Sequence, residues 1–102
     1  SFKQTLFKLA LQRIRVPYQL TDSAKLRYVN YLKEHLKEAA EWIASEQMEE
    51  EMYLLEELCV ETAEEMEWLI GAASQCKEVT MFSHLMDRKR KKFGVKRKVF
   101  EL

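Results

Sequence analysis

Apolar residues recur at helical spacing in the first part of the chain. Over residues 2–16 they cover more than half of the helix circumference, at Phe2, Leu6, Phe7, Leu9, Ala10, Leu11 and Ile14. An apolar face of this width indicates a helix that packs against neighbours on two sides. Pro17 ends this helix, because it disfavours helical geometry at Val16 and has no backbone N–H to donate.

A second helix is expected from about residue 22 to residue 44. Thr21 and its polar neighbours can accept hydrogen bonds from the amides of the first turn. The phase of the apolar pattern slips between Ile43 and Met48, and several glutamates follow Ser45 at this slip. We therefore predict that Ser45 is both a helix cap and a hinge.

The apolar pattern then alternates between four-residue and three-residue spacing, over positions 48, 52, 55, 59, 62, 66, 69, 73, 76 and 80. Small or flexible residues fill this seam, which favours packing inside a bundle over a long independent coiled coil. Thr62 and Glu65 have the spacing of a capping box, which would permit a helix break just before Thr62. The segment could therefore form either one bent helix or two helices. The last helix is expected to continue past Gly71 and to end near Gly94.

These elements predict an all-α fold, a small bundle of three to five helices with long central helices and a basic C-terminal tail. Gly occurs twice and Pro once in 102 residues, which leaves few of the residues that loops require. The length suits a single core. We expect one helical domain over residues 1–94, followed by the basic tail over residues 95–102.

The charges are segregated along the chain although the net charge is zero. Residues 1–40 carry eight cations and three carboxylates, residues 41–67 carry eleven carboxylates and no cation, and residues 68–102 carry nine cations and three carboxylates. An acidic block of this strength either recruits a basic surface or folds back on the chain's own basic ends. The sequence leaves both alternatives open.

This chain lacks the residues that several classes of enzyme require. A phosphate-binding loop requires several close glycines, and Gly71 and Gly94 lie far apart. A di-metal bundle requires glutamates three residues before its histidines, where this chain has Leu32 and Met81. We therefore expect no catalytic residues, no metal site and no cofactor.

The two cysteines, Cys59 and Cys76, lie within the helical pattern and lack the spacing of a metal or redox motif. We interpret them as reduced core thiols. A catalytic pair, with either cysteine as the nucleophile and His84 as the base, is disfavoured. Reduced cysteines indicate an intracellular, reducing compartment, the cytoplasm or the nucleus. The basic first helix leaves the mitochondrial matrix open as an alternative compartment.

Four glutamates could gather on one helical face, and we interpret them as a solvated acidic face and not as a cation site: Glu57, Glu61, Glu64 and Glu65.

The strongest functional signal is a basic run near the C-terminus, made of Arg88, Lys89, Arg90, Lys91, Lys92, Lys96, Arg97 and Lys98. Such a run suits phosphate neutralisation, a nuclear localisation signal or an acidic protein groove. The alternative is a solvated segment tethered to the acidic middle of the chain. We expect that neutralising residues 88–92 leaves the fold unchanged and removes a partner.

The leading hypothesis is a non-enzymatic interaction or assembly subunit of a larger complex, with a protein partner or a second copy. It would dock through the basic arm and through an apolar seam of flexible residues: Met48, Met52, Leu55, Met66 and Leu69. The rival interpretation of this seam is internal core. The alternative function is a nucleic-acid-associated protein, such as a ribonucleoprotein subunit, that binds phosphates through residues 88–98. We expect no transmembrane segment, since no apolar stretch approaches about 20 residues.

Overall fold

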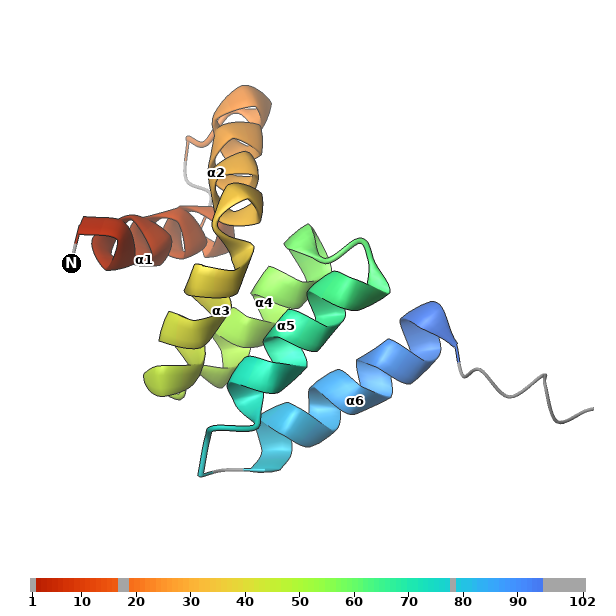
Figure 1. Ribbon diagram of the computed structural model, residues 1–102. Helices are drawn as coiled ribbons and strands as arrows, with labels where there is room; N and C mark the ends of the chain where they lie inside the picture. Colours follow the sequence, from red (N-terminus) through yellow and green to blue (C-terminus); the bar gives the residue numbers. More distant parts are fainter. Residues whose placement is uncertain (1, 17–18, 78, 95–102) are drawn as a thin grey trace, which may run out of the picture.

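Six helices account for all regular structure in residues 2–16, 19–77 and 79–94, which are the residues that the computed structural model describes (Figure 1). They are α1 (Phe2–Arg15), α2 (Asp22–Glu34), α3 (Leu36–Ser45), α4 (Glu49–Cys59), α5 (Ala63–Ala73) and α6 (Val79–Phe93). The all-α class is confirmed. The predicted number of helices is too low, because two of the expected long helices are each divided. The expected tail, residues 95–102, lies outside the described residues.

The N-terminal half contains a break that the apolar pattern did not predict. Thr21 caps α2 as expected, since its side chain accepts a hydrogen bond from the backbone N–H of Ala24 at 3.1 Å. The expected single helix over residues 22–44 is wrong, because His35 leaves helical geometry with φ −120° and ψ 32°. The ring of Phe7 from α1 lies 5.9 Å from the Tyr31 ring and 6.3 Å from the Trp42 ring, measured between centroids. Packing of α1 against both helices accompanies the break.

The chain reverses between α3 and α4, close to the predicted hinge. Ser45 is the last residue of α3, and its hydroxyl donates to the carbonyl of Trp42 at 2.7 Å. The predicted cap at Ser45 is therefore wrong. Met48 precedes α4 and makes no side-chain cap, while Gln47 adopts a positive φ of 55° in the turn. Three glutamates still occupy the first turn of α4, where carboxylates complement the helix dipole.

The capping box at Thr62 is present, which confirms the two-helix alternative at this point. Thr62 accepts from the backbone N–H of Glu65 at 3.1 Å, and the Glu65 carboxylate accepts from the backbone N–H of Thr62 at 3.1 Å. The expected continuation of this helix to Gly94 is wrong, since α5 ends at Ala73 and α6 starts at Val79. Gly94 does follow the end of α6, with a positive φ of 76° that glycine tolerates.

The buried side chains form one cluster to which all six helices contribute. Helix α5 packs against α3 and α6, while α1 and α2 pack on each other beside α3 and α4 (Figure 1). The sharp turn after α5 lets α6 lie back along α5, which buries Met81 and Leu85. None of the described helices is long and apolar enough to cross a bilayer.

Candidate functional site

The apolar seam expected to bind a partner lies inside the domain. Met52, Leu55, Met66 and Leu69 have 0% exposed surface, and Met48 is partly buried against the core. A partner could reach the four buried side chains only if the helices separated. On the folded domain the expected docking seam is therefore core, because α4 and α5 turn these side chains toward the other helices.

The described part of the basic run is neutralised by the chain itself. Arg88 and Lys92 bind Glu56, and Lys89 binds Glu67. The remaining two cations, Arg90 and Lys91, lie 2.6 Å and 3.0 Å from the carboxylate oxygens of Asp87. Lys96, Arg97 and Lys98 fall outside the described residues. The pairing argues against the expectation that neutralising residues 88–92 leaves the fold unchanged.

Glu56 is the one buried charged residue in the part of the chain that the structure describes. Its carboxylate accepts two hydrogen bonds from the Arg88 guanidinium, at 2.9 and 3.3 Å, and one from Lys92 at 3.0 Å. Lys92 also donates to the carbonyl of Val60 at the end of α4, at 2.6 Å. Burial raises the pKa of Glu56, but the hydrogen bonds from the two cations outweigh it, so the pKa is lowered. This cluster joins α4 to α6.

The basic N-terminal helices also pair with the acidic middle of the chain. Lys33 binds Glu61 of the acidic middle at 2.9 Å. Lys3 binds Glu38 at 3.1 Å, a pair that lies within residues 1–40. Arg15 bridges two residues in the first turn of α4, at 2.8 Å from Glu50 and 2.6 Å from Glu51. Together with the contacts of Arg88, Lys89 and Lys92, the pairs of Lys33 and Arg15 support the alternative in which the acidic block neutralises both basic ends.

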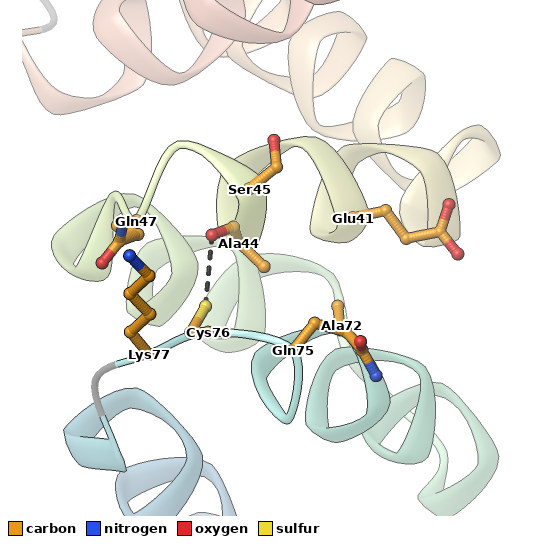
Figure 2. Close-up of a pocket in the computed structure, with 8 residues that line it drawn as sticks. All are labelled: Glu41, Ala44, Ser45, Gln47, Ala72, Gln75, Cys76 and Lys77. Atoms are coloured by element: carbon orange, nitrogen blue, oxygen red, sulfur yellow. Dashed lines mark hydrogen bonds between the residues drawn. The ribbon is translucent and has the colours of Figure 1, made fainter.

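An open depression of about 370 Å³ lies between the end of α3 and the turn after α5 (Figure 2). Cys76 lines it and donates its S–H to the carbonyl of Ala44 at 3.1 Å. The side chains of Glu41 and Ser45 point away from Cys76 in Figure 2. Burial raises the pKa of the Cys76 thiol, so this sulfur is not activated as a nucleophile. The depression brings no catalytic set together.

The other side chains that could carry chemistry are not brought together into a site either. Burial raises the pKa of the Cys59 thiol to about 12, which keeps it protonated and inert. The His84 ring lies against the Tyr53 ring, with 3.8 Å between ring centroids and a tilt of 36° between the ring planes. No group of three metal-ligating side chains occurs within residues 2–16, 19–77 and 79–94.

Helix α1 carries a second apolar stripe that no other helix covers. Its inner face buries Phe7 and Leu11, whereas Phe2, Leu9 and Val16 are 78%, 43% and 68% exposed. The three exposed residues are spaced seven apart, so they lie on one side of the helix. The helical hydrogen bonding reaches Val16, whose N–H bonds to the carbonyl of Gln12 at 2.9 Å.

Two partly exposed residues, Leu6 and Arg13, fill the gaps in this stripe. We call the set Phe2, Leu6, Leu9, Arg13 and Val16 the outer seam. The sequence indicated that α1 would need neighbours on two sides, but periodicity alone could not tell which side the domain covers.

No family model, curated protein or solved structure matches this chain.

Proposed function

We propose that this chain is a non-enzymatic helical interaction module, a subunit of a larger complex, and that it docks through the outer seam of α1. The observation that carries the proposal is the row of exposed Phe2, Leu9 and Val16, opposite a helix face that is already buried. A helix that is apolar on both sides is typical of one that is covered on both sides.

The dimensions of the outer seam suit a helix-sized contact. From Phe2 to Val16 it extends over fifteen residues, and the fourteen steps between them span about 21 Å at the rise of an α-helix. Exposed large apolar residues that gather in a continuous row mark interaction surfaces more often than scattered ones do. The separation of the cysteines, histidines and carboxylates into inert settings supports a binding role rather than a catalytic one.

Phosphate binding through residues 88–98 has weaker support. Every cation from Arg88 to Lys92 has a carboxylate partner on this chain, and nucleic acid would have to displace those carboxylates. Displacing Glu56 in particular would leave a carboxylate buried without a cation.

Photo-crosslinking in cells tests the proposal. A photoreactive side chain in place of Leu9 should give protein adducts, and a second variant that also carries Phe2→Glu and Val16→Glu should lose them. Val79, which is 69% exposed on α6, provides the matched position. Equal adducts at Leu9 and Val79, or none at Leu9, would contradict docking through α1.

A further inference from the structure

We draw no further inference here: the strongest candidate, the exposed apolar surface patch along the outer seam of α1, carries no class of partner, because Lys3 and Arg15 of this helix are already paired within the chain and nothing in the structure shows what covers the patch.

Discussion

The cluster around Glu56 gives the most quantitative prediction about this fold. The Glu56 side chain is 2% exposed, whereas those of Arg88 and Lys92 are 35% and 27% exposed. Removing both cations, with the double substitution Arg88→Met and Lys92→Met, leaves a carboxylate buried without a counter-charge. It also removes the hydrogen bond from Lys92 to the carbonyl of Val60.

Breaking a buried ion pair from one side costs about 3–5 kcal/mol. Water reaches the outer parts of both cations, which reduces their contribution. We therefore expect the double variant to lose about 3 kcal/mol of the free energy of unfolding at neutral pH. A domain of this size has about 5–15 kcal/mol in total, so the variant should still fold.

The loss should depend on pH in a defined direction. In the natural chain the two cations lower the pKa of Glu56 below its ordinary value of 4.5, so its stabilising effect is present above pH 4.5 and is lost as the pH falls through the lowered pKa. In the double variant only burial remains, which raises the pKa of Glu56. The cost of burying the ionised Glu56 carboxylate without a cation then grows as the pH rises above 4.5. The difference between the two proteins should therefore be largest near pH 7 and should shrink toward pH 4.

Urea unfolding followed by circular dichroism at several pH values measures this difference. The matched control is Arg90→Met with Lys91→Met, which removes two cations of the same helix that bind the exposed Asp87. The control variant should unfold at the same urea concentration as the natural chain. Equal destabilisation of the two double variants, or a difference that stays constant from pH 7 to pH 4, would refute the reasoning.

Three further predictions concern single side chains. Met66→Ala should lower the free energy of unfolding by about 2–5 kcal/mol in chemical denaturation, because Met66 is core and its removal leaves a cavity; a neutral result would restore it as a surface residue. Thr62→Ala should cost about 1 kcal/mol in the same assay, since it removes the capping box of α5; no change would contradict that role. The Cys59 thiol, with its pKa raised to about 12, should react with a thiol reagent at pH 8 only after urea unfolds the chain, and fast reaction in the native protein would contradict its burial.

Local signals in the sequence were sufficient for the fold class and for two helix starts. Thr21 and the Thr62 and Glu65 pair act through neighbours three residues away, so their roles can be read without knowledge of the fold. The breaks at His35 and after Ala73 involve contacts between distant segments. Phe7 packs beside the first break, and Cys76 bonds to Ala44 beside the second. Neither contact has a periodic signature.

The functional interpretation of the sequence was limited for the same reason. A seam of Met and Leu looks the same whether it faces a partner or the core, and only the placement of α4 and α5 shows that Met52 and Leu55 are enclosed. The basic run looked available for a partner because its carboxylates are distant in sequence. Glu56 lies 32 positions from Arg88 and 36 from Lys92.

The most direct test of docking through α1 is a crosslinking scan along the helix. A photoreactive side chain is placed in turn at Phe2, Leu9 and Val16, which belong to the outer seam, and at Lys8 and Gln12, which are exposed but lie outside it. We predict that the yield of protein adducts in cells follows the helix period, high at the three seam positions and low at the other two. A yield that is uniform along α1, or that is highest at Lys8 and Gln12, would contradict docking through the outer seam.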